Sequence, residues 1–397
     1  MNKSNWTYKK LVEICDIFGR IGFRGYTRDD YVNTIEEGAI SLSPSNIINN
    51  QLDFSNCTYI TWDKYNQSPE IKIYEGDVIF VKTASVGKCA YVSVLPHEST
   101  INPQFVVFKN ISIFNRFLYY ELLSPTFQYK VKRITSGTSV PTITQKGLSE
   151  LLISFPNKTE QERIVAELDL LSSIIEKKKA QLKELDQLAQ SIFYTMFGDP
   201  ITNEKGWEVK KIEDICVSIV RGPFGSALKK EFFVEPNETT YKVYEQKHAI
   251  QKSATIGSYY VSEEKYNELS RFELRPFDII MSCSGTIGEL YRLPFDAQKG
   301  IMNQALLKFT LNNNVCYEYF VFMMEYMKQN FIVRGSGLQN IGSVKIIKSM
   351  SFGLPPLPLQ QEFASKIEAI ERQKTLIQQS IDEVQTLFDS RMDYWFG

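Results

Sequence analysis

The sequence has few residues of the kinds that bind metal ions tightly. It contains two histidines, His97 and His248, and six cysteines among 397 residues. No two cysteines form a Cys-x-x-Cys pair, so the ligand spacing of a structural zinc site is missing. The cysteines are Cys15, Cys57, Cys89, Cys216, Cys283 and Cys316. Because scattered cysteines are typical of a reducing compartment, we expect a cytoplasmic protein that binds no metal.

Long apolar runs are missing as well. No stretch of the sequence approaches the roughly 20 consecutive apolar residues that a membrane span needs. Residues 1–10 are polar and lack the apolar segment of a signal peptide. We therefore expect the protein to have no membrane partner.

Neither sign of charge predominates in the chain, because 45 Lys and Arg stand against 46 Asp and Glu. This balance argues against a protein that coats nucleic acid without regard to sequence. A protein that reads a short nucleic-acid site needs only local basic patches, and the balance does not exclude that class.

The motifs of several enzyme classes are incomplete. Gly87-Lys88 lacks the upstream glycine and the following hydroxyl of a P-loop, so no ATP site of that kind is predicted. Residues 102–105 (Asn-Pro-Gln-Phe) differ at the third position from the Asn-Pro-Pro-aromatic motif of amino-methyltransferases. Residues 70–72 (Glu-Ile-Lys) resemble a nuclease Glu-x-Lys pair but have no counterpart in the second half of the chain. The sequence thus predicts a protein without catalytic activity or a cofactor of its own.

What the chain does contain is a long helical segment that occurs twice. Residues 156–198 and 355–397 each begin at a proline and end in Phe-Gly, and each carries apolar residues at steps of four and three. Such a heptad stripe predicts a long helix that buries one face. Lys178, Lys374 and Arg391 interrupt the stripes. The stripe consists of Ile164, Leu168, Leu171, Ile175, Leu182, Leu185, Ala189, Ile192 and Met196 in the first copy, and of Phe363, Ile367, Ile370, Ile377, Ile381, Val384, Phe388 and Trp395 in the second.

Two stripes of equal length can bury each other in a coiled coil. At about 1.5 Å per residue the coil would be about 60 Å long and could act as a rigid ruler. If a pseudo-twofold axis relates the two halves and crosses the coil, the helices are antiparallel. The alternative is that each helix packs separately on its own globular domain.

The globular parts are repeated too. Residues 6–15 (Trp-Thr-Tyr-Lys-Lys-Leu-Val-Glu-Ile-Cys) match residues 207–216 (Trp-Glu-Val-Lys-Lys-Ile-Glu-Asp-Ile-Cys). Short apolar strands are predicted at residues 76–80 and 277–281. We therefore expect an α+β protein with two pseudo-repeated globular domains, residues 1–155 and 199–354, joined by two long helices, residues 156–198 and 355–397, that form an antiparallel coiled coil.

Glycine-rich and basic loops recur at equivalent places in both halves. Residues 19–25 and 221–226 follow the opening segments, and polar loops follow the predicted strands. Glycine lets the backbone approach a ligand closely, and arginine can bind a phosphate or a guanine edge. A solvated surface turn is the competing interpretation. The predicted DNA-binding residues are Arg20, Arg24, Lys82, Lys88, Lys132 and Arg133 in the first domain, and Arg221, Lys229, Lys230, Lys247, Arg334 and Gln339 in the second.

The order of these parts resembles the specificity subunit of type I restriction-modification systems. Two variable globular segments are each followed by a nearly repeated helix that begins after a proline and Gln-Glu, at residues 161–162 and 361–362, and residues 207–294 look like a target recognition domain of that family. The resemblance implies a non-catalytic subunit whose recognition domains each read one half of a bipartite double-stranded DNA site. It also implies that the helices set the spacer and bind two methyltransferase subunits, which use S-adenosylmethionine, and that endonuclease or translocase subunits, which use ATP and magnesium, complete the assembly. Because the loops of the two domains differ, the half-sites are expected to differ.

Two functions of other classes are weighed against this one. The first is a fused or divergent DNA methyltransferase or nuclease, which would act without partners. The second is an interaction protein whose coiled coil joins two protein- or RNA-binding domains. Binding to duplex DNA with a steep salt dependence distinguishes the predicted function from the second alternative.

Overall fold

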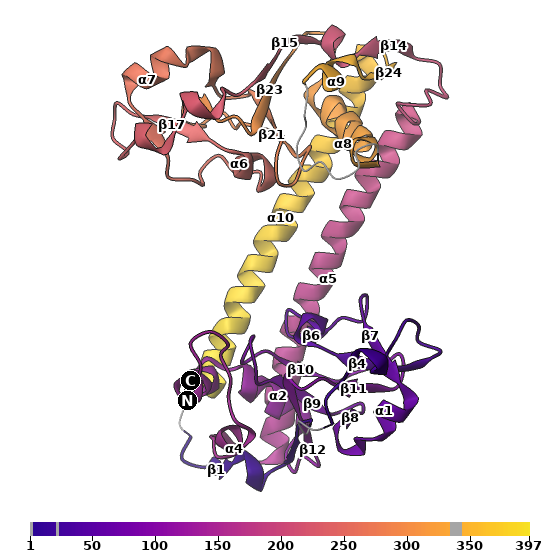
Figure 1. Cartoon of the computed structure of the whole chain (residues 1–397), viewed down its shortest axis with the longest axis vertical. Coiled ribbons are helices and arrows are strands. Elements are labelled where there is room, and N and C mark those ends of the chain that lie inside the picture. Colours follow the sequence, from indigo (N-terminus) through magenta and orange to yellow (C-terminus); the bar gives the residue numbers. More distant parts are fainter. Residues whose placement is uncertain (1–2, 21–23, 334–343) are drawn as a thin grey trace. The chain divides into compact units, whose positions relative to one another are not determined.

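The computed structural model describes residues 3–20, 24–333 and 344–397, and the chain divides into two compact units. Unit 1 comprises Met1–Lys179 and Gln378–Gly397, and unit 2 comprises Ala180–Ile377. Two long helices, α5 (Lys158–Phe197) and α10 (Leu357–Phe396), each contribute one part to either unit (Figure 1). Each unit therefore contains a globular part and portions of both long helices.

The globular part of unit 1 is built on two main sheets. The first has the strand order β10-β9-β12-β2 and is antiparallel. The second has the order β3-β7-β4-β11-β8, in which β4 and β11 are parallel. The strands of the first sheet are β2 (Asp16–Phe18), β9 (Val78–Val81), β10 (Cys89–Tyr91) and β12 (Phe105–Lys109). Those of the second are β3 (Tyr31–Val32), β4 (Gly38–Leu42), β7 (Thr58–Thr61), β8 (Lys72–Ile73) and β11 (Ser99–Ile101).

Strand β9 lies between two apolar layers because its side chains alternate between the faces of the sheet. Val78 and Phe80 join the core that includes the helices, whereas Ile79 and Val81 join the core shared with the second sheet. All four side chains are fully buried. The continuous apolar run that the sequence places here is thus explained by burial on both faces.

Unit 2 repeats the topology of the two main sheets strand for strand. Its sheets have the orders β15-β23-β20-β21 and β16-β18-β17-β22-β19, and β17 and β22 form the parallel pair. The strands of the first sheet are β15 (Cys216–Arg221), β20 (Ile279–Ser282), β21 (Leu290–Arg292) and β23 (Leu306–Leu311). Those of the second are β16 (Phe233–Val234), β17 (Tyr241–Tyr244), β18 (Tyr260–Val261), β19 (Glu273–Leu274) and β22 (Gly300–Met302). The pseudo-repeat predicted from the sequence therefore extends to the pairing of the strands.

Short helices and small strand pairs complete each unit. Unit 1 contains α1 (Trp62–Asn66), α2 (Asn115–Leu123), α3 (Pro125–Ile134) and α4 (Gln145–Ser149), with the pairs β1 (Thr7–Lys10) with β13 (Leu152–Phe155) and β5 (Ile47–Ile48) with β6 (Gln51–Leu52). Unit 2 contains α6 (Gln246–Ile250), α7 (Glu263–Glu268), α8 (Tyr317–Val333) and α9 (Val344–Ser349), with the pair β14 (Glu208–Lys211) and β24 (Ser351–Leu354).

The long helices run antiparallel. In unit 1 the first turns of α5 meet the last turns of α10, where Arg391 Nη2 donates to Glu167 Oε2 over 3.0 Å. In unit 2 the end of α5 meets the start of α10, where the rings of Phe197 and Phe363 lie 5.2 Å apart. The predicted α+β fold with two pseudo-repeated domains and antiparallel long helices is confirmed.

A buried glutamine in the first turn of each long helix ties the helix to its globular part. Gln161 Nε2 donates to Pro156 O over 2.8 Å, and Gln161 Oε1 accepts from the backbone of Phe114. In unit 2, Gln360 Nε2 donates to Pro355 O over 2.8 Å, and Gln360 Oε1 accepts from Cys316 N. The sequence comparison pairs Gln161 with residue 361, and this pairing is wrong by one position, because only Gln360 makes the equivalent bonds.

None of the predicted seam residues is exposed. The fully or almost fully buried ones are Ile164, Leu168, Leu171, Ile175, Phe363, Ile367, Ile370 and Ile381. The half-buried ones are Leu182, Leu185, Ile192, Ile377, Val384 and Phe388. Near the end of α5, Phe193 and Phe197 are buried more completely than Ile192 and Met196. An α-helix with 3.6 residues per turn drifts by about 20° per heptad against a strict seven-residue repeat, which moves the buried stripe on by one residue.

Two of the charged residues that interrupt the stripes, Lys374 and Arg391, form ion pairs with residues of α5. Lys374 Nζ lies 2.8 Å from Asp186 Oδ1 of α5 and 2.9 Å from Glu371 Oε1 of its own helix. Arg391 pairs with Glu167, whose carboxylate also accepts from Trp395 Nε1 over 3.1 Å. Hydrogen bonds from Arg391 hold the pKa of Glu167 below its usual value. The interruptions therefore carry specific contacts within the helix pair.

The buried carboxyl group of Glu121, in α2, should make the stability of unit 1 depend on pH. Burial raises the pKa of this carboxyl to about 7, although Lys130 and Lys3 act in the opposite direction. Because the folded-state pKa is raised, the free energy of unfolding is highest below the ordinary pKa of 4.5. It falls by roughly 3 kcal/mol as the pH rises to about 7. We expect Glu121→Gln to remove this loss, so hydrogen exchange of residues 115–134 should slow at pH 8 relative to the unchanged protein but not at pH 5. An equal effect at both pH values would contradict the prediction.

Candidate nucleic-acid interface

In unit 2, polar side chains gather where the strands of the first sheet end. Arg221 ends β15, Ser284 follows β20, and Gln304 precedes β23. Because these strands are neighbours, their ends meet at one edge of the sheet, where Arg221 Nε donates to Gln304 O over 3.2 Å. The edge contains a cavity of about 690 Å³, lined by Ile219, Val220, Arg221, Gly222, Pro223, Phe224, Arg271, Phe272, Ser284, Gln304, Ala305 and Val344.

The loop after Arg221 is held closely against the neighbouring chain segment. Gly222 N donates to Leu306 O over 3.0 Å, and a Cβ atom on Gly222 would overlap the Asn303 carbonyl group. A Cβ atom on Gly225 would lie 2.8 Å from Gln304 Oε1. Only glycine permits such a close approach of two backbones at position 222, whereas the neighbour of Gly225 is the end of the flexible Gln304 side chain. The loop therefore presents its side chains from a fixed backbone.

The equivalent edge of unit 1 carries different side chains. Lys82 follows β9, and its N–H donates to Gln104 O over 2.8 Å, as the N–H of Cys283 donates to Ala305 O in unit 2. The Lys82 side chain is half-buried, and burial lowers the pKa of its ammonium group. Nearby, Thr83 Oγ1 and Thr142 Oγ1 lie 3.0 Å apart. Unit 1 thus has a partly desolvated lysine, Lys82, at this edge of its sheet. The residue at the equivalent position of unit 2 is Cys283.

Arg20 is placed differently from Arg221, which lies in the corresponding loop of unit 2. Its side chain is only 5% exposed; one guanidinium nitrogen donates to Arg24 O over 2.9 Å and another donates to the Tyr26 hydroxyl. The guanidinium carbon lies 3.8 Å from the centre of the Tyr26 ring. Arg24 is half-buried and pairs with Glu70 over 3.3 Å. This location does not suit the direct DNA contact predicted for Arg20, because its donors point into the protein; it suits support of the loop that carries Arg24.

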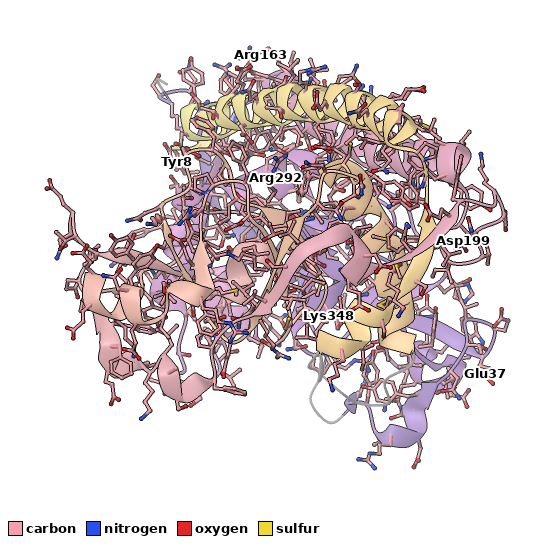
Figure 2. All side chains as sticks on the ribbon, turned by 90° about the horizontal axis from the view of Figure 1, so that it is seen from above. Tyr8, Glu37, Arg163, Asp199, Arg292 and Lys348 are labelled. Carbon is pink, nitrogen blue, oxygen red and sulfur yellow. The ribbon has the colours of Figure 1, made fainter. Side chains whose placement is uncertain are left out.

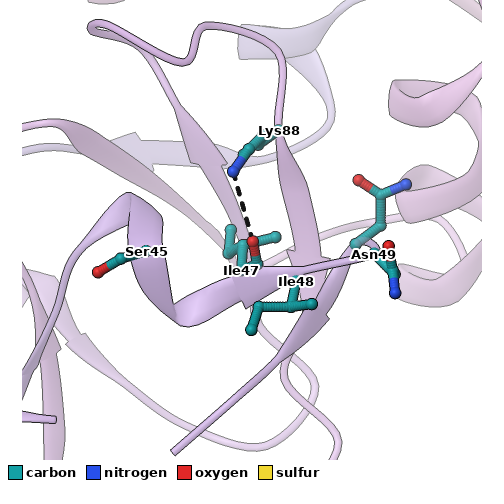
Figure 3. Close-up of a pocket in the computed structure, with 6 residues that line it drawn as sticks. Ser45, Ile47, Ile48, Asn49 and Lys88 are labelled. Carbon is teal, nitrogen blue, oxygen red and sulfur yellow. Dashed lines mark hydrogen bonds between the residues drawn. The ribbon is translucent and has the colours of Figure 1, made fainter. Parts of the chain in front are cut away.

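Lys88 lies beside a hairpin that the sequence analysis missed. Strands β5 and β6 are joined by Asn49 and Asn50, whose φ angles of 51° and 61° suit a type I′ turn. Lys88 Nζ donates to Ile47 O over 3.5 Å (Figure 3). The hairpin and Lys88 enclose a cavity of about 390 Å³, lined by Ser45, Ile47, Ile48, Asn49, Asn50 and Lys88. Two adjacent asparagines after the apolar pair Ile47-Ile48 were the sequence signal for this turn.

The other predicted residues of unit 1 lie on α3. Lys132 and Arg133 are exposed in its last turn. Lys132 lines a cavity of about 640 Å³ together with residues 84–86, the loop after β9. The structure therefore brings Lys132, but not Arg133, to a loop at the strand ends.

Lys229, Lys230 and Lys247 of unit 2 do not line the Arg221 cavity. Lys229 and Lys230 are exposed, and Lys229 pairs with Glu231 over 3.6 Å. Lys247 pairs with Glu245 over 2.7 Å and lies 5.4 Å from the centre of the Tyr259 ring. Arg334 and Gln339 lie outside the described residues.

Several basic residues of unit 2 were not singled out from the sequence. Arg271 lines the Arg221 cavity, and only the fold brings it there from the segment before β19. Figure 2 labels two more, Arg292 of β21 and Lys348 of α9. The Arg292 guanidinium lies 5.1 Å and 4.9 Å from the centres of the Phe277 and Tyr317 rings. It is therefore engaged in cation–π contacts with these two rings.

Neither a metal centre nor a membrane span is found in the part of the chain that the structure describes. Among residues 3–20, 24–333 and 344–397, no three His, Cys, Asp or Glu side chains are grouped so that they could hold a metal ion. Within the same residues, every helix is too short or too polar to cross a membrane.

The comparison with protein families matches both halves of the chain. A family model described as the type I restriction modification DNA specificity domain matches residues 3–187 and 204–386. The chain belongs to this family. It is therefore a specificity subunit of a type I restriction-modification system, with DNA-recognition domains and without catalytic activity. The family membership confirms the resemblance and favours a specificity subunit over the two alternative functions.

Individual relatives agree over almost the whole length. The chain is 22% identical to the type I restriction enzyme MjaIX specificity subunit of Methanocaldococcus jannaschii, covering 92% of this chain and 87% of that protein. It is 21% identical to the StySPI specificity subunit of Salmonella potsdam, covering 92% and 81%. The solved S subunit from M. genitalium aligns with a TM-score of 0.54 at 15% identity, covering 99% of this chain and 96% of that one. A chain from a structural study of complex assembly and conformational transition of the type I R-M system aligns with a TM-score of 0.58 at 16% identity, covering 99% and 98%. These two structures support the same fold.

Proposed function

We propose that this specificity subunit reads an asymmetric bipartite site in duplex DNA. Residues 1–155 bind one half-site, residues 199–354 bind the other, and the helices in residues 156–198 and 355–397 set the spacer between them. The proposal rests on a contrast at corresponding strand ends of two domains that share one topology. Unit 1 has Lys82 where unit 2 has Cys283, and Arg20 is buried whereas Arg221 lines a cavity. Unlike side chains on like scaffolds favour unlike half-sites.

The proposed DNA contacts come from the strand-end loops and from the basic residues beside them. Lysines bind phosphates, and arginines bind phosphates or guanine edges. Arg20 is assigned the supporting role described above. The proposed contacts are Arg24, Lys82, Lys88, Lys132 and Arg133 for the first half-site, and Arg221, Lys229, Lys230 and Lys247 for the second. For Arg334 and Gln339, DNA contact remains a prediction from the sequence.

The outward faces of the long helices are proposed to bind two methyltransferase subunits. Leu188 of α5 and Leu387 of α10 occupy equivalent positions of the repeat, and each is 48% exposed. Leu170 and Leu376 are exposed as well. Exposed leucines on a polar helix surface suit a protein interface. The bound methyltransferase subunits supply S-adenosylmethionine, and endonuclease or translocase subunits, which use ATP and magnesium, join through them; the chain itself binds no cofactor.

The test is to express the chain with the methyltransferase subunit encoded beside it and to map methylated adenines across the host genome. We expect a two-part motif with unlike halves that is absent when this chain is omitted. Lys82→Ala should lower methylation of the motif about tenfold. Arg221→Ala should relax the sequence requirement of the second half-site only. A stable complex that methylates no bipartite motif would contradict the proposal.

A further inference from the structure

Phe224 is the starting point for an inference that rests on the proposed function. Its side chain is 89% exposed, the largest exposed fraction among the large apolar side chains of the described residues. A single exposed apolar side chain is common on protein surfaces. The surroundings of Phe224 distinguish it from the other exposed aromatic residues.

The backbone on both sides of Phe224 is fixed. Pro223 is buried, a Cβ atom on Gly222 would overlap the Asn303 carbonyl group, and Phe224 O accepts from Ala227 N over 2.9 Å. The ring therefore projects from a stiff loop, which reduces the conformational entropy that binding would cost. A mobile loop could instead fold the ring back onto the protein.

Basic and polar groups surround the base of the ring. Phe224 lines the same cavity as Arg221 and Arg271, together with Ser284 and Gln304. Arg271 is exposed, and its guanidinium lies 5.9 Å from the centre of the Phe272 ring. Guanidinium groups of this kind suit the phosphates of a nucleic-acid backbone, and an apolar ring in the same cavity wall suits the bases.

We propose that Phe224 is a wedge that inserts between two stacked base pairs of the half-site bound by unit 2. Arg221 and Arg271 hold the flanking phosphates while the ring separates the base step. A wedge of this type makes binding depend on how easily that step unstacks, so it contributes specificity without a hydrogen bond to a base edge. Phe224 is thus a specificity-determining residue whose selectivity acts through DNA deformation.

The test uses the complex with the methyltransferase subunits and a duplex that carries the methylated motif. 2-Aminopurine replaces single bases along both half-sites, and its fluorescence rises where stacking is lost. The adenines that become methylated are left unlabelled, because methyltransferases take their target base out of the stack. Variants are Phe224→Ala, Phe224→Leu and, as a matched control, Phe295→Ala, which removes a ring that is 77% exposed elsewhere in unit 2.

We expect a fluorescence rise at one step of one half-site with the unchanged complex. Phe224→Ala should abolish the rise and weaken binding about 10- to 100-fold, whereas Phe224→Leu, which is still an apolar wedge, and Phe295→Ala should keep it. Binding without any rise, or a rise that Phe224→Ala leaves unchanged, would overturn the wedge. So would a loss of affinity on replacing thymine by deoxyuridine without a change in fluorescence, since that result means contact with a thymine methyl group. Absence of DNA binding by the unchanged complex would instead overturn the proposed function itself.

Discussion

Gly222→Ala is expected to abolish recognition of one half-site while the other half-site is still read. An added Cβ atom would overlap the carbonyl group of Asn303, whose backbone is held by Asn303 N donating to Tyr244 O over 2.9 Å. The loop must therefore move away, and the bond from Gly222 N to Leu306 O is lost. Because Arg221 and Phe224 depend on this backbone, methylation of the motif should fall about 100-fold, roughly the effect of two lost contacts.

Two controls separate this effect from general damage. Ser226→Ala changes an exposed residue of the same loop and should leave methylation unchanged. Gly206→Ala adds a Cβ atom with no neighbour within 4 Å but at a φ of 70°, so it should cost stability of about 1 kcal/mol without loss of recognition. Genome-wide mapping of methylated adenines measures all three variants. Full methylation by Gly222→Ala would show that the loop can shift without consequence.

Trp395→Ala is expected to detach the last turns of α10 from unit 1. Trp395 is 2% exposed, belongs to the core that includes Ile164 and Leu168 of α5, and donates to Glu167. Truncation of a buried tryptophan typically costs about 3–5 kcal/mol, and here it also removes a hydrogen bond to a carboxylate. Denaturant unfolding of the purified chain should reveal this loss.

The neighbouring residue provides the matched control for Trp395→Ala. Tyr394 is 46% exposed, so Tyr394→Ala should change stability by less than about 1 kcal/mol. Hydrogen exchange should increase in residues 378–396 for Trp395→Ala and stay unchanged for Tyr394→Ala. An equal response of the two variants would mean that the buried contacts of Trp395 do not anchor the helix.

The repeat and the heptad stripes were enough to predict the two long helices and the duplicated domains. The side chains that decide a helix stripe lie three and four positions apart, so their pattern can be read directly along the chain. Ile164, Leu168, Phe363 and Ile367 are buried where the stripe places them. A strict seven-residue repeat missed the shift from Ile192 to Phe193, because a helix of 3.6 residues per turn drifts against that repeat over four heptads.

The arginines of the glycine-rich loops show what the sequence did not determine. Arg20 and Arg221 lie in corresponding loops of the two units, yet Arg20 is buried against Tyr26 whereas Arg221 lines a cavity with Arg271. The environment of each side chain is set by strand pairing with segments that lie far away in the sequence. Such pairing follows from the packing of whole sheets. The sequence by itself therefore determined the helix pair, the duplication and the family, and only the tertiary structure decided which loop side chains are buried and which line a cavity.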